Sequence, residues 1–322
     1  MKAIVMERFG APDVLVQREV ADPVVGPGDA LIDVEFASVT FVETQIRAGR
    51  APHASMLPEL PVVPGNGVGG VVADVGSDLD TALLGARVVS TTGGSGGYAE
   101  LAAVAAATVL PVPGELATDV AVALLADGRT AVGLIERSAI QAGETVLVEA
   151  AAGGVGALLV QLAKRAGARV VAAAGGERKL KTAEALGADI LVDYRSPSWT
   201  AELAELLDGD RLDVVFDGVG GPIGRAGFEL LGPGGRLCGF GMASGQFVSI
   251  AEDELRDRGV TLLRGAAPDP ARMAALSAEA IRAAAAGELR PVIGQKLPLA
   301  SAAEAHRAIE ARATIGKTLL FP

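Results

Sequence analysis

The sequence predicts an α/β protein in which a mostly β region precedes a doubly wound parallel sheet with helices on both faces. Up to about residue 119, short strand-like runs are separated by glycine and proline. From Asp119 onward, short apolar runs alternate with helix-forming segments, which is the pattern of βαβ units. A glycine turn at 153–156 connects a strand-like run to a helix-forming run, and it indicates a binding function for the second region.

The first region is expected to contain many strands and little helix. Pro52, Pro58, Pro61 and Pro64 mark a long loop in the middle of this region. The strand-like runs are Lys2–Met6, Val14–Glu19, Ala30–Ala37, Gly67–Val75, Ala86–Ser90 and Tyr98–Val104, with one short helix at Phe41–Gly49.

The second region is expected to alternate strands and helices. Its predicted strands are Thr145–Val148, Arg169–Ala174, Ile190–Asp193, Asp213–Asp217, Gly235–Phe240 and Val260–Gly265. Its predicted helices are Val120–Ala126, Thr130–Arg137, 157–167, Glu177–Leu186, Thr200–Leu207 and Gly224–Leu231.

The last part of the chain departs from this alternation. Two long helices, Ala271–Ala286 and Ser301–Arg312, precede a strand at Lys317–Phe321. We expect this part to pack on the first region. The predicted domain limits are therefore 1–122, 123–265 and 266–322, with the third segment completing the first domain.

The turn at 153–156 has the features of a phosphate-binding loop. A strand, a glycine turn and a helix in this order bring main-chain N–H groups and the positive end of a helix dipole up to a phosphate. Gly153 lets a pyrophosphate approach the backbone, and Gly156 lets the helix pack closely on the strand. Ala151 replaces the usual first glycine, so the spacing alone is weak evidence. The following strand at Arg169–Ala174 favours a Rossmann dinucleotide site over a plain chain reversal.

Composition excludes several classes of function. The net charge of −11 argues against a nucleic-acid-binding surface. No uninterrupted apolar run reaches the roughly 18 residues of a membrane span, and the first residues lack a secretory pattern. Cys238 is the single cysteine, so no intramolecular disulfide can form. These observations predict a cytoplasmic protein with neither nucleic acid nor membrane as partner.

Seven segments resemble one enzyme family. They are MKAIVMERFGAPDVL, TFVETQIRAGR, PVVPGNGVGGVVADVGSDL, AAAGGVG, ALGADILVDYRS, PGGRLCGFGMASG and HRAIEARATIGKTLLFP. Together they resemble the zinc-independent quinone oxidoreductase branch of the medium-chain dehydrogenase/reductase superfamily, along the whole chain. The resemblance implies a GroES-like, mostly β catalytic domain, a Rossmann NADPH-binding domain and a homodimer.

A zinc site or a serine hydrolase is not supported by the residues. Zinc-dependent relatives need Cys, His and acidic ligands, whereas this chain has one cysteine and two histidines, and Asn66 replaces part of a metal-binding segment. His306 is expected to be a surface or packing residue, while the role of His53 stays open. Gly93–Gly97 spells Gly-x-Ser-x-Gly but leads into a strand, whereas a nucleophile elbow must open a helix.

The second strand of the βαβ unit favours NADPH over NADH. It ends in Gly175-Gly176 without the acidic residue that binds a ribose 2′-hydroxyl. Through the resemblance, Lys179 and Tyr194 match residues near a 2′-phosphate, and Arg178 adds positive charge. The alternative is that Arg178 and Lys179 are a solvated helix start.

Further cofactor contacts are carried over from the resemblance. Thr130 matches a threonine near the nicotinamide, and Lys317 follows a glycine often close to the cofactor. The alternatives to cofactor contact are that Phe240 is a core residue and that Lys317 is an exposed charge at the edge of a sheet. The complete predicted set is Thr130, Ala152, Gly153, Gly154, Val155, Gly156, Gly175, Gly176, Arg178, Lys179, Tyr194, Val219, Phe240, Gly241, Met242 and Lys317.

The predicted catalytic residues are hydrogen-bond donors for a developing oxyanion, namely Thr40, Gln45 and Thr130. Thr40 stands where relatives commonly have Asn, and Gln45 where bacterial relatives often have Tyr. Arg47 is expected to pair with Glu43 one helical turn away.

The predicted activity is hydride transfer from NADPH to a quinone or an α,β-unsaturated carbonyl, without zinc. The alternatives are an enoyl-thioester reductase, with weak support from Arg47 and Arg50, and an NADPH-binding structural or sensing protein with little turnover.

Overall fold

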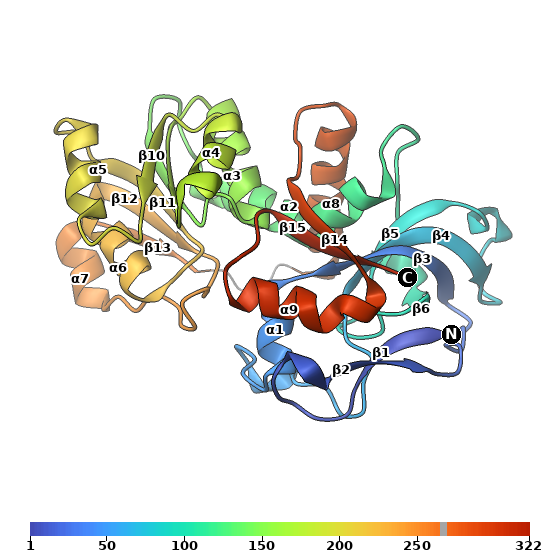
Figure 1. Ribbon diagram of the computed structural model, residues 1–322. Helices are drawn as coiled ribbons and strands as arrows, with labels where there is room; N and C mark the ends of the chain where they lie inside the picture. The colour runs from blue at the N-terminus through green and yellow to red at the C-terminus, as the bar shows by residue number, and fades with distance from the viewer. Residues whose placement is uncertain (265–268) are drawn as a thin grey trace. The chain divides into compact units, whose positions relative to one another are not determined.

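The chain forms two compact units, shown in a computed structural model that describes residues 1–264 and 269–322 (Figure 1). Unit 1 comprises Met1–Arg129 and Ser277–Pro322, and unit 2 comprises Thr130–Leu276. The units therefore divide within two long helices, α2 (Thr118–Ser138) and α8 (Pro270–Ala285). The sequence analysis placed the domain limits between residues 122 and 123 and between residues 265 and 266. The structure divides after Arg129 and after Leu276 instead, and residues 265 and 266 lie outside the described ranges.

Unit 2 is built on one parallel sheet with the strand order of a Rossmann fold. The order β10-β9-β8-β11-β12-β13 places the first strand of the unit, β8, in the middle, and the strand order reverses between β8 and β11. The strands are β8 (Thr145–Glu149), β9 (Arg169–Ala174), β10 (Ile190–Asp193), β11 (Leu212–Asp217), β12 (Leu231–Gly239) and β13 (Thr261–Leu263). This confirms the predicted α/β fold class.

Helices cover both faces of this sheet. Right-handed crossovers put α3 (Gly154–Arg165) and α4 (Glu177–Ala185) on one face and the later helices on the other (Figure 1). The later helices are α5 (Trp199–Leu207), α6 (Gly221–Leu230) and α7 (Glu252–Arg258). Buried side chains of α5 and α6, including Trp199, Leu203 and Phe228, share a core with Leu147 and Val215 of the central strands.

Unit 1 contains an antiparallel-rich sheet that the end of the chain completes. Its order is β14-β15-β3-β4-β5-β7, with β6 also paired to β3 and a separate β1-β2 ribbon. Residues Thr318, Leu319 and Leu320 of β15 pair antiparallel with β3. The strands are β1 (Lys2–Met6), β2 (Leu15–Glu19), β3 (Asp29–Val39), β4 (Gly67–Val75), β5 (Arg87–Thr91), β6 (Leu101–Ala105), β7 (Leu110–Pro111), β14 (Ile293–Pro298) and β15 (Lys317–Phe321).

Two short helices, α1 (Phe41–Arg47) and α9 (Ala302–Glu310), lie beside one another in unit 1. The core joins Ile4, Ile32, Val68 and Leu320 from the strands to Ala305 of α9. The 3₁₀ helices of the described chain are Pro12–Val14, Ala54–Met56, Thr81–Leu83, Ala106–Thr108 and Leu299–Ser301.

Several predicted elements differ from the observed ones. The two helices predicted at Val120–Ala126 and Thr130–Arg137 form the single helix α2. Gly128 lies within this helix and lets Ala280 approach closely, since a Cβ there would lie 2.6 Å from that of Ala280. The sequence reasoning missed three elements. β7 has only two residues, α7 is almost entirely charged, and β14 alternates half-buried with exposed residues. The strand predicted at Val260–Gly265 is β13, and its last predicted residue lies outside the described ranges.

Close packing between α3 and β8 requires glycine at one position. A Cβ at Gly156 would collide with the Ala150 carbonyl oxygen, and Ala150 itself is held at a positive φ of 49°. The first turn of α3 therefore lies directly against the end of β8, as the sequence predicted for Gly156.

Replacing Gly156 with alanine is expected to destabilise the protein by about 1–3 kcal/mol, because the helix must move away from the strand. Gly239→Ala is the matched control in the same unit, since a Cβ at Gly239 would meet nothing within 4 Å. Chemical denaturation of the two variants measures the difference. Equal stability of both variants would contradict the close packing.

Candidate functional site

The turn between β8 and α3 places the first main-chain N–H groups of a helix at the carboxyl edge of the parallel sheet. Gly153 is the N-cap of the 12-residue helix α3 and supplies no side-chain cap. The turn is held from behind, because Gly153 N donates to Ala150 O (2.8 Å) and Ala151 N donates to Ala173 O (3.1 Å). The first N–H groups of α3 have no acceptor within the helix. This uncapped helix end fits a phosphate group, which its N–H groups and dipole would stabilise.

The end of β9 lies beside a group of cations. Arg178 is exposed and Lys179 is half-buried at the start of α4, which follows Gly176 at a φ of 101°. A Cβ on Gly175 would lie 3.3 Å from the Tyr194 ring and 3.3 Å from the Arg195 side chain. Tyr194 and the predicted cations are thus close to the same turn. This arrangement suits a dianionic phosphate.

Arg195, which follows β10, lies next to this turn and was missed by the sequence reasoning. Its guanidinium binds Asp193 at the end of β10 through Nε and Nη2 at distances of 2.6–3.1 Å, and these hydrogen bonds hold the pKa of Asp193 below its usual range. A Cβ on Gly176 would lie 2.9 Å from the same guanidinium. Its position directly after Tyr194 was the available signal.

Asp217, at the end of β11, anchors two loops that carry predicted cofactor residues. Its Oδ1 accepts hydrogen bonds from Val219 N (2.9 Å) and Gly220 N (2.6 Å). Its carbonyl oxygen accepts from Phe240 N (2.9 Å) and Gly241 N (3.2 Å), at the end of β12. The sequence reasoning assigned Asp217 only to a strand, so its side-chain role was missed.

The two loops are also bonded to each other. Ser244 N donates to Val219 O (2.8 Å), and the Phe240 ring lies over Gly218, where a Cβ would be 2.7 Å from it. Val219 is buried, whereas Phe240, Gly241 and Met242 are half-buried. Phe240 is therefore not a fully enclosed core residue, which was the alternative to a cofactor contact.

In unit 1, Thr40 precedes α1 and is bound to a buried carboxylate. Glu43 Oε2 accepts hydrogen bonds from Thr40 N (2.6 Å) and Thr40 Oγ1 (2.8 Å), and Glu43 Oε1 accepts from Asn66 N (2.9 Å). A threonine hydroxyl has one hydrogen to donate. In this arrangement Thr40 presents acceptor lone pairs to a ligand, and it donates to one only if the bond to Glu43 is exchanged.

The network continues inward through two buried rings. Tyr98 OH lies 3.4 Å from Glu43 Oε2 and 3.1 Å from His306 Nε2 on α9. Burial, together with the Glu43 charge, raises the pKa of Tyr98 well above its usual range, and burial raises the pKa of Glu43. Burial lowers the pKa of His306 to about 3. His306 is thus a neutral packing residue, which confirms the packing interpretation over the surface one.

The predicted Arg47–Glu43 pair is wrong. Arg47 is 2% exposed, and its guanidinium binds Glu310 of α9 and the carbonyl oxygen of Gly10. Glu43 is occupied by the donors described above. The helical spacing was compatible with a pair, but the tertiary partner on α9 takes the guanidinium.

Gln45 and Lys317 are both buried and engaged within unit 1. Gln45 Nε2 donates to Thr44 Oγ1 at 3.0 Å. Lys317 Nζ is paired with Asp127 at 3.0 Å, and its side chain is 3% exposed. The alternative of an exposed edge charge for Lys317 is therefore wrong. Thr130 is half-buried and opens the part of α2 that belongs to unit 2.

Within residues 1–264 and 269–322, no group of three or more His, Cys, Asp and Glu side chains could hold a metal ion. Asn66 Oδ1 accepts a hydrogen bond from Gly94 N (2.7 Å), and His53 is exposed. Cys238 is buried, and burial raises the pKa of its thiol to about 12. The Gly93–Gly97 segment leads towards β6 rather than into a helix, as the sequence predicted.

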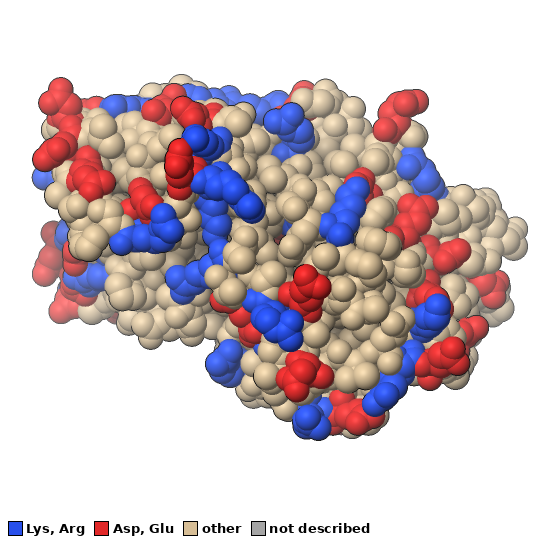
Figure 2. Space-filling model, in the orientation of Figure 1, with Lys and Arg blue, Asp and Glu red and all other residues tan. Residues whose placement is uncertain are grey.

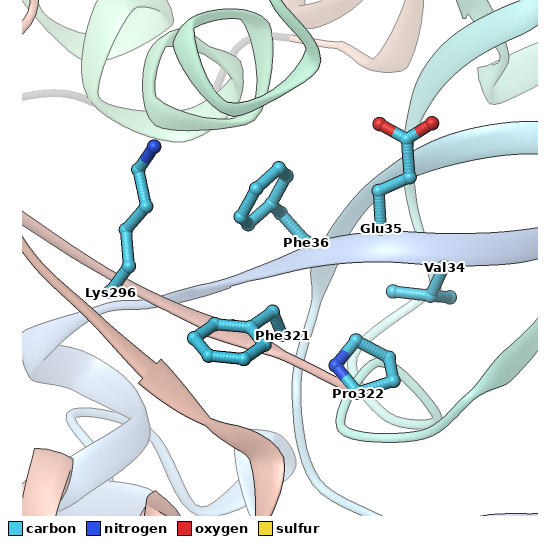
Figure 3. Close-up of a pocket in the computed structure, with 6 residues that line it drawn as sticks. All are labelled: Val34, Glu35, Phe36, Lys296, Phe321 and Pro322. Carbon is cyan, nitrogen blue, oxygen red and sulfur yellow. The ribbon is translucent and has the colours of Figure 1, made fainter.

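A hollow of about 480 Å³ lies on unit 1 (Figure 3). Phe36, Phe321 and Pro322 line it, and Lys296 lies with its ammonium 5.3 Å from the Phe36 ring centroid. Lys296 is also paired with Asp119. The hollow contains none of the predicted site residues, so it does not define the candidate site.

Charged side chains are mixed on the visible surface. On the face in Figure 2, basic and acidic side chains alternate over both units rather than forming one large basic area. Among the described residues, no helix is long and apolar enough to cross a membrane.

Family models match both units. The alcohol dehydrogenase GroES-like domain matches residues 26–114, and the zinc-binding dehydrogenase model matches residues 154–279. A quinone oxidoreductase from Pseudomonas aeruginosa is 32% identical over 100% of this chain and 99% of its own length. The chain belongs to the quinone oxidoreductase branch of the medium-chain dehydrogenase/reductase superfamily.

Three other proteins with known names or structures are also similar to this chain. A 2-haloacrylate reductase from a Burkholderia species is 31% identical over 99% of this chain and 98% of its own length. The Escherichia coli quinone oxidoreductase complexed with NADPH has a TM-score of 0.91 at 28% identity, with both chains fully covered. The Thermus thermophilus quinone oxidoreductase, solved alone and with NADPH, has a TM-score of 0.84 at 32% identity, again with both chains fully covered.

Substituting His306 with glutamine is expected to flatten the pH dependence of stability. The folded-state pKa of about 3 lies below the unfolded value of 6.5, so the unfolded state binds the extra proton and stability is lost as the pH falls. Between pH 6.5 and pH 5 the free energy of unfolding of the wild type should fall by about 2 kcal/mol relative to that of H306Q.

Urea denaturation at these two pH values measures the effect, and H53Q, at the exposed histidine, is the control. If H306Q and H53Q keep the wild-type pH dependence, His306 is not buried in its neutral form.

Proposed function

We propose that the protein is an NADPH-dependent reductase that transfers a hydride to a quinone or an α,β-unsaturated carbonyl without a metal ion. The observation that carries this proposal is the uncapped N-terminus of α3 at the carboxyl edge of a Rossmann sheet, beside a second turn rich in cations. The NADPH complexes of the Escherichia coli and Thermus thermophilus enzymes support it.

The residues of unit 2 fit NADPH in two places. The N–H groups at Gly154–Gly156 would bind the pyrophosphate, with Ala152 and Gly153 forming the approach to it. Lys179, Arg178 and Tyr194, beside Gly175 and Gly176, would bind the 2′-phosphate. Arg195 lies next to them, with its charge paired to Asp193. No acidic residue ends β9, which disfavours recognition of a free 2′-hydroxyl at that position; Glu177, the first residue of α4, pairs with Lys181.

NADPH supplies the hydride when it is bound. Val219, Phe240, Gly241 and Met242, in the two loops anchored by Asp217, are proposed to contact it, as are Thr130 and Lys317. Lys317 is neutralised by Asp127, so its proposed contact would come from the aliphatic stem or main chain rather than from free charge.

The acceptor oxygen becomes negative as the hydride arrives, and it needs a hydrogen-bond donor. Thr40, Gln45 and Thr130 are the proposed donors. Thr40 can donate to the acceptor only if its hydroxyl hydrogen no longer bonds Glu43. The raised pKa of Glu43 favours this, because a protonated Glu43 donates to Thr40 Oγ1 and leaves the threonine hydrogen for the acceptor.

The acceptor class has two candidates within this proposal. The similarity to quinone oxidoreductases supports a quinone as the acceptor of this chain, and the similarity to a 2-haloacrylate reductase supports an electron-poor alkene. An enoyl thioester loses the support of Arg47, because Arg47 is buried and paired with Glu310; of the two arginines, Arg50 is the exposed one. A structural or sensing role predicts NADPH binding without turnover.

The proposal is tested by measuring the loss of absorbance of the reduced nicotinamide in the presence of quinones, enones or enoyl thioesters. We expect oxidation of NADPH with at least one quinone or enone, and slower oxidation of NADH. Tight binding without turnover on any acceptor would favour the sensing role, and absence of binding would reject the proposal.

Replacing Lys179 with alanine should weaken NADPH binding about ten- to hundredfold, since a charge-assisted hydrogen bond contributes about 1.5–3 kcal/mol. NADH binding should not change. Lys181→Ala is the matched control, because Lys181 is exposed on the same helix and pairs with Glu177. Fluorescence titration measures both affinities, and equal effects of the two substitutions would argue against a phosphate role for Lys179.

Metal removal should leave the activity unchanged. After dialysis against EDTA, the rate of NADPH oxidation is expected to equal that of the untreated protein, and added Zn²⁺ should not raise it. Loss of activity that Zn²⁺ restores would contradict a zinc-independent mechanism.

A further inference from the structure

Two acidic side chains are buried side by side where the strand order of the unit 2 sheet reverses. Glu149 ends β8 and Asp217 ends β11, and both side chains are 0% exposed. Phe216 is paired with Val148, so the next residues of the two neighbouring strands are Asp217 and Glu149. The crevice at this reversal is where Rossmann folds bind dinucleotides.

Helix α6 leaves room for both carboxyl groups. A Cβ on Gly224 would collide with Asp217 Oδ2, and a Cβ on Gly227 would lie 2.6 Å from Glu149 Oε1. The two glycines are three residues apart and therefore share one face of the helix. The carboxyl pair is thus built into the contact between α6 and the sheet.

The two carboxyl groups are bonded very differently. Asp217 Oδ1 accepts two main-chain N–H groups, which stabilise its negative charge. Within the described chain, no donor from another group reaches Asp217 Oδ2 or either oxygen of Glu149. Two unpaired buried anions in contact would be very costly, whereas a proton on Glu149 gives the pair one O–H to O⁻ hydrogen bond.

Among residues 1–264 and 269–322, no positive charge is found to act on Glu149. On β11, the charged neighbour of Glu149 is Asp217. On β9, Glu149 is paired with Ala173, and the residues of α6 that face the two carboxyl groups are glycines. Burial, followed by the charge of Asp217 and the hydrogen bond to it, raises the pKa of Glu149 well above its usual range. Glu149 is therefore the neutral member of the pair.

We propose that Glu149 is a positioning residue for the cofactor: as a neutral acid it donates a hydrogen bond to Asp217 and so fixes the two loops that Asp217 anchors. These loops, 218–220 and 240–246, contain the proposed contacts Val219, Phe240, Gly241 and Met242. The inference rests on the proposed NADPH function. Ionisation of Glu149 would set two anions against each other and disturb both loops, so NADPH binding weakens as the pH rises.

Two variants of Glu149 separate hydrogen bonding from packing. Glu149→Gln keeps the shape and an N–H donor without a titratable proton, whereas Glu149→Met keeps the approximate length without a donor. At about pH 6 we expect E149Q to bind NADPH within about twofold of the wild type. E149M should bind about tenfold more weakly, because without the hydrogen bond a smaller fraction of the molecules has the loop conformation that binds NADPH. Equal binding by E149M and E149Q overturns the proposal.

The pH profile gives an independent result. Above the pKa of Glu149, the apparent dissociation constant of the wild type should rise up to about tenfold per pH unit, because only the protonated form binds well. In E149Q this rise should be absent. The other groups that titrate near the phosphates are the same in both proteins, so their effect cancels in the ratio. E205Q, at an exposed glutamate of α5, is the matched control and should follow the wild type.

The protonation state can be measured without NADPH. The infrared spectrum of the wild type at neutral pH should contain a carboxylic-acid C=O band that E149Q lacks. If this band is missing, or if wild type and E149Q share one pH profile of binding, Glu149 does not act as a neutral positioning acid. If the wild type binds NADPH at no pH, the proposed function itself fails, and the infrared result still reports on the pair.

Discussion

The carboxyl edge of one parallel sheet is the constraint on which the rest of unit 2 depends. The turn after β8, the turn after β9 and the loops after β11 and β12 all leave this edge, so residues far apart in sequence come to one side of the sheet. The helix α3 can begin directly at the end of β8 only because residue 156 has no side chain. Main-chain N–H groups and cations are thereby gathered where a dinucleotide phosphate would need them.

Unit 1 is governed by a different interaction, the buried carboxylate of Glu43. It binds Thr40, Asn66 and Tyr98, and through Tyr98 it reaches His306 on a helix near the end of the chain. Buried polar groups of this kind are stable only when each is hydrogen-bonded, which explains why the network is extensive. It also limits the chemistry, because the hydroxyl proposed to assist the acceptor is already engaged.

The sequence was sufficient where local pattern and tertiary structure agree. The strand, turn and helix around Gly153–Gly156 follow from local chemistry, and the structure confirms them. Long-range partners were not predictable: Arg47 binds Glu310 instead of its helical neighbour Glu43, and Glu149 meets Asp217 only because β8 and β11 are adjacent. The sequence predicted separate helices at Val120–Ala126 and Thr130–Arg137, but α2 is continuous, and Gly128 within it packs against Ala280. In each case a tertiary contact outweighs a local preference.

Hydrogen exchange of the main-chain amides in the 150–156 and 175–179 segments, with and without saturating NADPH, tests the central claim most directly. We expect slower exchange at Gly154, Val155 and Gly156, whose N–H groups would gain a phosphate acceptor. At the turn after β9, we expect NADPH to slow exchange more than NADH does. Unchanged exchange at the first turn of α3 in a protein saturated with NADPH would contradict it.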